Sequence, residues 1–199
     1  MLEQRRRLSP EDRRQELLAF GREFFSEHPA DAFSMAQIAD RAGVSKGLLY
    51  NYFGGRRGFY VATVSAIRDE VAARTAPEPG VPFERAFGDA LTRYVEWVRD
   101  HGAIYRVLVQ GGLGVDGEVG DIVESLRRTT VGRIVGAMGI EPTPAVSIAL
   151  YGWVCFAENA CLDWLGRQDA VSASAMVRLL AGALRGALAA AGQEDGEAE

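Results

Sequence analysis

Apolar residues recur at helical spacing along most of the chain, whereas the strict alternation that marks β-strands is scarce. In the first third, this pattern predicts four helices, over residues 10–25, 34–42 and 45–51 and from residue 56 to about 74. Ser9 and Ser45 precede two of these helices as N-cap candidates, and Gly43 separates the two short ones. The pattern therefore predicts an all-α protein whose N-terminal part contains two short helices joined by a glycine turn.

The segment 76–82 marks the clearest boundary in the chain, because its three prolines and one glycine exclude a helix interior. Beyond it, the pattern predicts helices over residues 83–100, 103–110, 121–138, 143–167 and 172–191. The helix over 143–167 is apolar nearly all round, so it must be covered on several sides. Residues 193–199 form an acidic tail that is predicted to be disordered.

Composition changes this picture in two respects. Apolar residues make up 48% of the chain, which is enough for a core without disulfides or metal, and Cys155 and Cys161 are interpreted as two free, buried thiols. The net charge of −5 argues against nucleic-acid binding, but the charge is unevenly distributed. Residues 1–75 carry 12 basic and 10 acidic residues, whereas residues 76–199 carry 10 and 17. A mildly basic head on an acidic body fits a DNA-binding protein.

Several classes of function are disfavoured. The chain shows no signal peptide and no stretch of ~18 uncharged apolar residues, so we expect a cytoplasmic protein without membrane contact. His28 and His101 lie far apart, with no cysteine or carboxylate at metal-ligand spacing, and no nucleophile elbow is apparent. The G-x-G-x-x-G run at 112–117 follows a predicted helix rather than a strand, which favours a flexible loop. We therefore expect no enzyme activity, cofactor or metal.

The segment 34–53 has the layout of a helix-turn-helix. In this motif, the N-terminal end of the second helix meets base edges in the major groove of DNA. That end consists here of Ser45, Lys46 and Gly47. A lysine can donate to the guanine acceptors, and a glycine lets the backbone approach the DNA closely. The segment therefore predicts a sequence-reading element.

Aromatic and basic residues follow this element. The hydroxyl groups of Tyr50 and Tyr52 are interpreted as phosphate contacts, although a core position is the alternative for both, and Phe53 is expected in the core. Arg56 lies where the backbone N–H groups of the next helix also favour phosphate. The arginines at 5–7 form either a DNA-contacting arm or a solvated tail.

The run Ile38-Ala-x-x-Ala-Gly-Val-Ser-x-Gly-x-Leu-Tyr-x-Tyr-Phe53 resembles the DNA-binding signature of the TetR-type (TetR/AcrR) transcriptional regulators. The resemblance continues loosely to Tyr60 and is more specific than a generic helix-turn-helix. It implies a nine- or ten-helix homodimer that binds double-stranded operator DNA. The implied DNA-binding residues are Ser34, Ser45, Lys46, Gly47, Tyr50, Asn51, Tyr52 and Arg56. The chain departs from the family pattern at Arg57-Gly58, where an acidic residue is common, and Arg56 replaces the usual lysine.

The rest of the chain is interpreted as a ligand-binding and dimerisation body. We expect a DNA-binding domain over 1–55, a connecting helix over 56–75, the body over 76–192 and the tail over 193–199. The helices 143–167 and 172–191 of two chains are expected to form a four-helix bundle, because a monomer would expose a large apolar patch.

The resemblance also implies a small-molecule ligand in the body. The candidate ligand-binding residues are Tyr94, Trp97, Tyr105, Trp153, Phe156, Glu158 and Asn159. Glu158 interrupts an apolar helix, and a buried carboxylate requires a partner. That partner is either an internal arginine, Arg106 or Arg133, or a group on the ligand.

The leading hypothesis is a homodimeric repressor that a small-molecule ligand releases from its operator. The alternative is a DNA-binding regulator with no small-molecule inducer, controlled by a protein partner or by its abundance. Stabilisation of the folded chain by candidate ligands distinguishes the two hypotheses.

Overall fold

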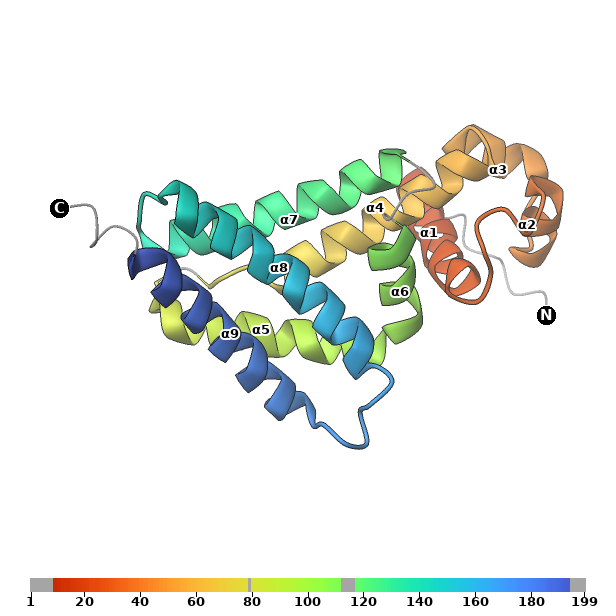
Figure 1. Ribbon diagram of the computed structural model, residues 1–199. Coiled ribbons are helices and arrows are strands. Elements are labelled where there is room, and N and C mark those ends of the chain that lie inside the picture. Colours follow the sequence, from red (N-terminus) through yellow and green to blue (C-terminus); the bar gives the residue numbers. More distant parts are fainter. Residues whose placement is uncertain (1–8, 79, 112–116, 194–199) are drawn as a thin grey trace. The chain divides into compact units, whose positions relative to one another are not determined.

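A computed structural model describes residues 9–78, 80–111 and 117–193 of the chain (Figure 1). The predicted arginine arm at 5–7, most of the glycine-rich loop and residues 194–199 of the acidic tail lie outside the described residues. The chain divides into two compact units, Met1–Ile67 and Arg68–Glu199. One helix continues from the first unit into the second.

The described residues form nine α-helices and no strand. The helices are α1 (Pro10–Glu27), α2 (Met35–Arg41), α3 (Lys46–Phe53), α4 (Arg56–Arg74), α5 (Phe83–Asp100), α6 (Gly102–Gly111), α7 (Gly117–Met138), α8 (Pro144–Trp164) and α9 (Ala173–Gln193). The all-α fold class predicted from the hydrophobic pattern is confirmed. The largest difference is at the start of α7, which begins four residues before the expected position.

The first unit contains α1, α2, α3 and the first three turns of α4, packed around a cluster of aromatic and aliphatic side chains. Ile38 of α2, Leu49 of α3 and Phe59 of α4 are completely buried in this cluster. At Gly21, helix α1 lies close to α4: a Cβ atom there would lie 2.5 Å from the Thr63 hydroxyl and 2.8 Å from the Phe59 ring. The absence of a side chain at this position therefore sets the distance between the two helices.

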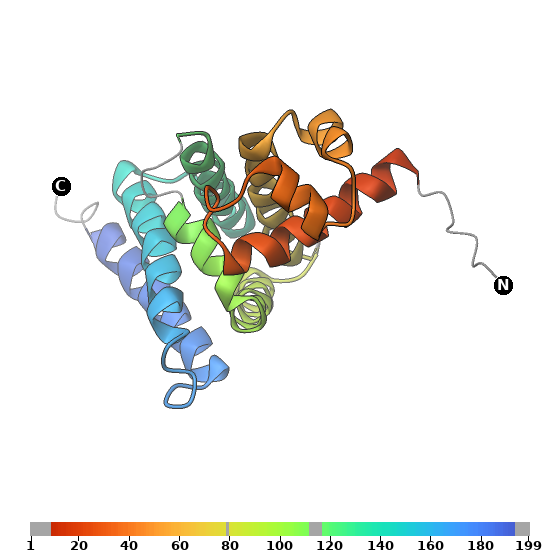
Figure 2. The same ribbon diagram turned by 90° about the vertical axis from the view of Figure 1, so that its right-hand side faces the viewer.

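The second unit contains α5 to α9 and the C-terminal end of α4. Helices α8 and α9 lie side by side in both views, α5 also packs along α9, and α7 packs against α8 (Figure 1, Figure 2). Two buried indole N–H groups donate to main-chain oxygens, Trp153 to Leu180 at 2.9 Å and Trp164 to Val171 at 2.7 Å. These bonds satisfy polar groups that would otherwise be costly to bury.

Helices α8 and α9 are long and apolar enough to cross a membrane by length and composition alone. A core helix of a soluble protein passes the same test. Helix α8 buries one side against its neighbours within the unit, through residues that include Leu150, Trp153 and Trp164. The apolar character of the two helices is thus accounted for in part by packing inside the body.

A first prediction tests the close approach of α1 and α4. We expect Gly21→Ala to lower the free energy of unfolding by about 1–3 kcal/mol, because the new methyl group overlaps Thr63 and Phe59. The matched control is Gly132→Ala on an exposed part of α7, where a Cβ meets nothing within 4 Å. That variant should be as stable as the parent or slightly more stable. Urea denaturation checks both, and equal behaviour of the two variants would contradict the steric argument.

Candidate functional site

Serine caps and one glycine fix the two short helices of the first unit. Ser34 and Gln37 form a reciprocal capping box at the start of α2, and the Ser45 hydroxyl accepts a hydrogen bond from the Leu48 N–H at 3.1 Å at the start of α3. Between the helices, Gly43 adopts a φ of +65°, in the left-handed region that favours glycine. Local sequence chemistry therefore fixes both ends of the turn.

Helix α3 has one face in the core and one face outside it. Leu49 and Phe53 are buried, as expected for Phe53, whereas Lys46, Tyr50 and Asn51 are exposed. The ammonium group of Lys46 lies 5.5 Å from the centroid of the Tyr50 ring, a cation–π arrangement that keeps both side chains on the outer face. The outer face of α3 thus presents donors without being needed for packing.

Gly47 lies on the same outer face. A Cβ atom there would meet no atom of the described chain within 4 Å, so packing does not require a glycine at this position. Gly58 contrasts with it, because a Cβ there would collide with the main-chain oxygen of Phe53. The glycine at position 58 therefore has a steric reason, whereas the chain itself gives no steric reason for Gly47.

The remaining predicted DNA-binding residues differ in their surroundings. The hydroxyl groups of Ser34 and Ser45 are exposed but serve as caps. Tyr52 is half-buried and packs against the core of the unit. Arg56 is exposed, and its Nη1 donates to the main-chain oxygen of Asp31 at 3.1 Å. A further exposed cation, Arg41 at the end of α2, lies 4.0 Å from the centroid of the Phe33 ring, and the motif did not single it out.

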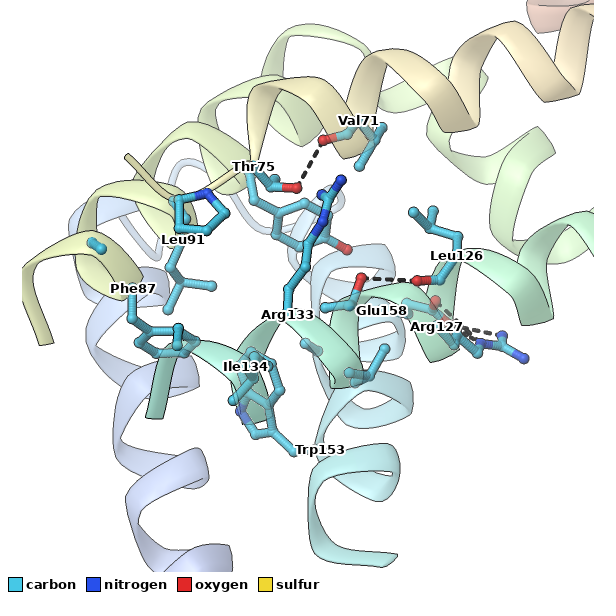
Figure 3. A pocket seen from close by; sticks show the side chains of 18 of the residues that line it. Val71, Thr75, Phe87, Leu91, Leu126, Arg127, Arg133, Ile134, Trp153 and Glu158 are labelled. Carbon is cyan, nitrogen blue, oxygen red and sulfur yellow. Dashed lines mark hydrogen bonds and ion pairs between the residues drawn. The ribbon is translucent and has the colours of Figure 1, made fainter. Parts of the chain in front are cut away.

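The second unit contains an apolar cavity of about 130 Å³, open to solvent on one part of its surface, between the end of α4 and helices α5, α7 and α8 (Figure 3). Its walls include Val71, Phe83, Phe87, Leu91, Leu126, Ile134, Trp153 and Val154. The lining also includes the polar residues Thr75, Tyr94, Arg127, Thr130, Arg133 and Glu158. The cavity thus combines an apolar interior with a small number of polar side chains, as small-molecule sites do.

The predicted ligand-binding residues fall into three groups. Tyr94, Trp153 and Glu158 line the cavity. Trp97 and Tyr105 are buried but do not line it, and the Trp97 indole donates to the Glu70 carboxylate at 2.8 Å. Phe156 and Asn159 are exposed, and the Asn159 amide donates to the Cys155 oxygen of its own helix.

Glu158 is only 7% exposed and forms an ion pair with Arg127 of α7. Arg127 donates to one carboxylate oxygen from Nε at 2.9 Å and from Nη2 at 2.7 Å. The expected internal partners, Arg106 and Arg133, are wrong: Arg106 is exposed on α6, and Arg133 donates to a main-chain oxygen instead. Burial raises the pKa of Glu158, and the Arg127 guanidinium partly offsets this effect.

Two tyrosines form a hydrogen-bonded chain beside this pair. The Tyr105 hydroxyl donates to the main-chain oxygen of Glu158 at 3.1 Å, and the Tyr94 and Tyr105 hydroxyls lie 2.6 Å apart. Because the Tyr105 hydrogen is directed to the carbonyl, Tyr94 must donate to Tyr105. Burial raises the pKa of both hydroxyls well above the ordinary value, so both stay neutral at physiological pH.

Two cavity arginines on α7 were missed as site residues by the sequence analysis. Arg127 was not considered, and Arg133 was considered only as a partner of Glu158. Arg127, Thr130 and Ile134 recur at helical spacing on α7, which places them along one side of that helix. This mixture of polar and apolar residues on one side is the signal that points to a wall of a cavity.

A head with a two-helix motif and a helical body with a cavity define the class of helix-turn-helix transcription regulators. Sequence profiles agree: residues 17–63 match bacterial regulatory proteins of the tetR family, and residues 84–186 match the tetracyclin repressor-like C-terminal domain. The chain belongs to the TetR family of DNA-binding transcription regulators, which are not enzymes. The expected family and the expected absence of catalytic function are therefore confirmed.

Individual relatives agree with this assignment. A curated relative, the HTH-type transcriptional activator FasR of Mycolicibacterium smegmatis, is 24% identical over 177 residues, 86% of this chain and 80% of that protein. A tetR-family regulator from Streptomyces coelicolor has a TM-score of 0.81 and 26% identity, covering 96% of this chain and 86% of that one. FadR of Bacillus subtilis, crystallised with stearoyl-CoA, shares the fold with a TM-score of 0.65 and 13% identity, covering 86% of this chain and 95% of that one.

A second prediction concerns the buried ion pair. We expect Arg127→Leu to lower the free energy of unfolding by about 3 kcal/mol, because it leaves the Glu158 carboxylate buried without a cation. The double variant Arg127→Leu/Glu158→Leu should recover most of this loss. Arg128→Leu, an exposed neighbour on the same helix, is the control and should change stability little. Urea denaturation measures all four proteins; a double variant no more stable than the single one would contradict this account.

Proposed function

We propose that the chain is a homodimeric repressor that binds operator DNA through α3 and leaves it when a small molecule occupies the cavity of the body. The division of α3 into a buried and an outer face carries this proposal. A regulator of this kind acts where the DNA is, in the cytoplasm.

The outer face of α3 supports contact with the major groove. Lys46 stands in the first turn of the helix, is exposed and forms no hydrogen bond with another of the described residues, so its donors are available to guanine. Gly47 has no packing reason to be a glycine, which fits a close approach of DNA backbone or bases to the main chain. Exposed Tyr50 and Asn51 and the guanidinium of Arg56 extend the same set of polar groups toward phosphates.

Apolar side chains exposed on α8 and α9 support the homodimer. Ile148 is 74% exposed, Leu179 53% and Phe156 43%. Ile148, Gly152 and Phe156 recur every four residues on one face of α8, and a Cβ at Gly152 would meet nothing within 4 Å. A glycine between two exposed apolar side chains permits a second α8 to approach closely. Burial of this face between two copies removes the apolar surface from water.

The cavity supports a ligand with an apolar part. Its walls are mostly aliphatic and aromatic, and they come from helices of one unit. The complex of Bacillus subtilis FadR with stearoyl-CoA shows that a protein of this fold can bind a molecule with a long apolar chain. Release from DNA then requires that the ligand bind the DNA-free form more tightly than the DNA-bound form.

The sign of regulation is a separate part of the proposal. FasR of Mycolicibacterium smegmatis is an activator, so family membership alone does not give repression. A reporter gene placed behind an operator that the chain binds measures the sign of regulation directly. Reporter expression should rise when the gene for the chain is deleted and when the ligand is supplied.

A third prediction tests the DNA interface. An operator is first selected from a pool of randomised duplexes, and affinity is then measured by fluorescence anisotropy at several salt concentrations. We expect Lys46→Ala to relax sequence preference, at a cost of about 1–3 kcal/mol on the selected site. Arg56→Ala should weaken binding to all duplexes and reduce the salt slope by about one.

The control for both variants is Arg106→Ala, which removes an exposed cation from the other unit and should leave binding unchanged. Because Arg56 also holds the Asp31 carbonyl, circular dichroism must show that the Arg56 variant is folded. If Lys46→Ala and Arg56→Ala both bind like the parent, the interface is wrongly placed.

A fourth prediction tests pairing through α8 and α9. We expect the double variant Ile148→Glu/Leu179→Glu to shift the chain from dimer to monomer in sedimentation velocity, because four buried carboxylates per dimer would lack partners. The control is Ile140→Glu. Ile140 is an apolar residue that is 40% exposed and lies between α7 and α8, outside both helices. That variant should sediment like the parent. If the double variant remains dimeric, the dimer interface must lie on another surface and the prediction is wrong.

A further inference from the structure

The two arginines that line the cavity differ in how their charges are balanced. Arg127 is paired with Glu158 and also lies 3.9 Å from the Glu124 carboxylate. Within the described residues, Arg133 has no carboxylate within ion-pair distance, and its Nη1 donates to the main-chain oxygen of Ala72 at 2.6 Å. Figure 3 shows Arg127 pointing away from the cavity and Arg133 extending from α7 toward Val71 and Thr75. The cavity wall therefore contains a cation that is neutralised by no anion of the described chain.

The carbonyl that Arg133 holds belongs to the last turn of α4. The final carbonyl groups of a helix lack helical partners and need other donors. Arg133 supplies one to Ala72, and Arg93 of α5 supplies others to Arg74 at 2.7 Å and to Ala76 at 3.1 Å. The end of α4 is thus held by two guanidinium groups, of which Arg133 lines the cavity and Arg93 does not.

We propose that the cavity binds an anionic amphiphile whose carboxylate pairs with Arg133 and displaces the Ala72 carbonyl from it. This inference rests on the proposed ligand site. It adds the chemical class of the ligand and names the hydrogen bond between Arg133 and Ala72 as the first contact that changes. A carboxylate matches the forked donors of a guanidinium and makes stronger, charge-assisted hydrogen bonds than a neutral carbonyl does. The ligand carboxylate therefore replaces the Ala72 carbonyl as the partner of the Arg133 guanidinium. The last turn of α4 then loses a hydrogen-bond donor.

The size of the cavity limits the apolar part of the ligand. An engineered cavity of about 150 Å³ accommodates benzene. The cavity here, at about 130 Å³, therefore suits a compact apolar group about the size of one aromatic ring, against Phe87, Leu91 and Trp153. Phenylacetate joins such a ring to a carboxylate and is the probe, and phenylacetamide is its neutral counterpart.

The carbonyl that Arg133 holds belongs to a helix that continues into the first unit. Helix α4 begins at Arg56, in the first unit, and ends at Arg74, where Arg133 and Arg93 hold its carbonyls. A change at the last turn of α4 is therefore a change at one end of a helix whose other end lies beside α3 in the sequence. The ligand's carboxylate, rather than its apolar part, is the group that causes the change.

Calorimetry tests the site. We expect the parent to bind phenylacetate at least tenfold more tightly than phenylacetamide, and Arg133→Gln to remove this difference. Arg133→Lys keeps a cation and should restore part of it. Arg128→Gln removes a cation from the exposed side of α7 and should bind like the parent. If phenylacetate does not bind, or if Arg133→Gln binds it like the parent, the proposal is wrong.

Hydrogen–deuterium exchange tests the displacement at α4. Phenylacetate should speed exchange of the amides at residues 72–76 in the parent but not in Arg133→Gln. Arg93→Gln should speed exchange at the same residues without ligand and leave phenylacetate affinity unchanged. Slower or unchanged exchange in the phenylacetate-bound parent would overturn the displacement of Ala72.

These measurements need no DNA, so their failure is distinguishable from failure of the proposed function. A chain that binds its selected operator and is released by some other molecule, but shows no phenylacetate binding, would overturn this inference alone. A chain that binds phenylacetate through Arg133 but never binds duplex DNA would overturn the proposed function and leave the carboxylate site standing.

Discussion

A helix that ends within a protein must find hydrogen-bond donors for its last carbonyl groups, and this constraint decides how α4 is held. Helix α4 is the described segment that both units share. Its C-terminal carbonyls at Ala72 and Arg74 accept from Arg133 of α7 and Arg93 of α5. Among the described residues, neither arginine has a buried carboxylate within ion-pair distance, and the carboxylate 3.9 Å from Arg93 belongs to exposed Glu78. Helix packing in the body thus depends on two cations whose main partners are main-chain dipoles.

The polar groups in the body have different functions according to their partners. The pair of Arg127 and Glu158 is closed, because each charge is satisfied by the other inside the protein. The hydrogen-bonded Tyr94 and Tyr105 are neutral and directed by the carbonyl of Glu158. Arg133 lines the cavity and has no carboxylate of the described residues within ion-pair distance, so its charge can pair with a ligand. Burial by itself therefore does not identify a ligand contact; the state of the partners does.

Much of the fold follows from the sequence because its signals are local. Ser9 and Ser45 are N-caps as predicted, and the proline-rich segment precedes α5 at the expected residue. Phe53 of α3 is buried as predicted, and Leu49, which the sequence analysis did not single out, is buried beside it. The start of α7 was misplaced, because Gly117 and Gly120 look like loop residues in sequence although both are helical.

The candidate sites were harder to predict, because they depend on contacts between distant residues. Glu158 was recognised as needing a partner, but Arg127 lies 31 positions away, and sequence alone does not choose it over Arg106 or Arg133. Trp97 and Tyr105 are aromatic residues with a polar group, as many ligand-binding residues are. Their side chains are nevertheless buried in the core and do not line the cavity. The contact of Arg133 with Ala72 spans 61 positions and has no sequence signature.

The exposed side chain on the first turn of α3 has a practical consequence. Lys46 is the sole lysine in the sequence, so amine-directed reagents have one side-chain target, and it stands on the proposed DNA-reading surface. Reductive methylation with ¹³C-formaldehyde would place an isotopic reporter there, with the chain's amino terminus as the other reactive amine. Acetylation at this position would neutralise the cation that is proposed to meet guanine. A single post-translational acetyl group would then be enough to alter which duplexes the chain prefers.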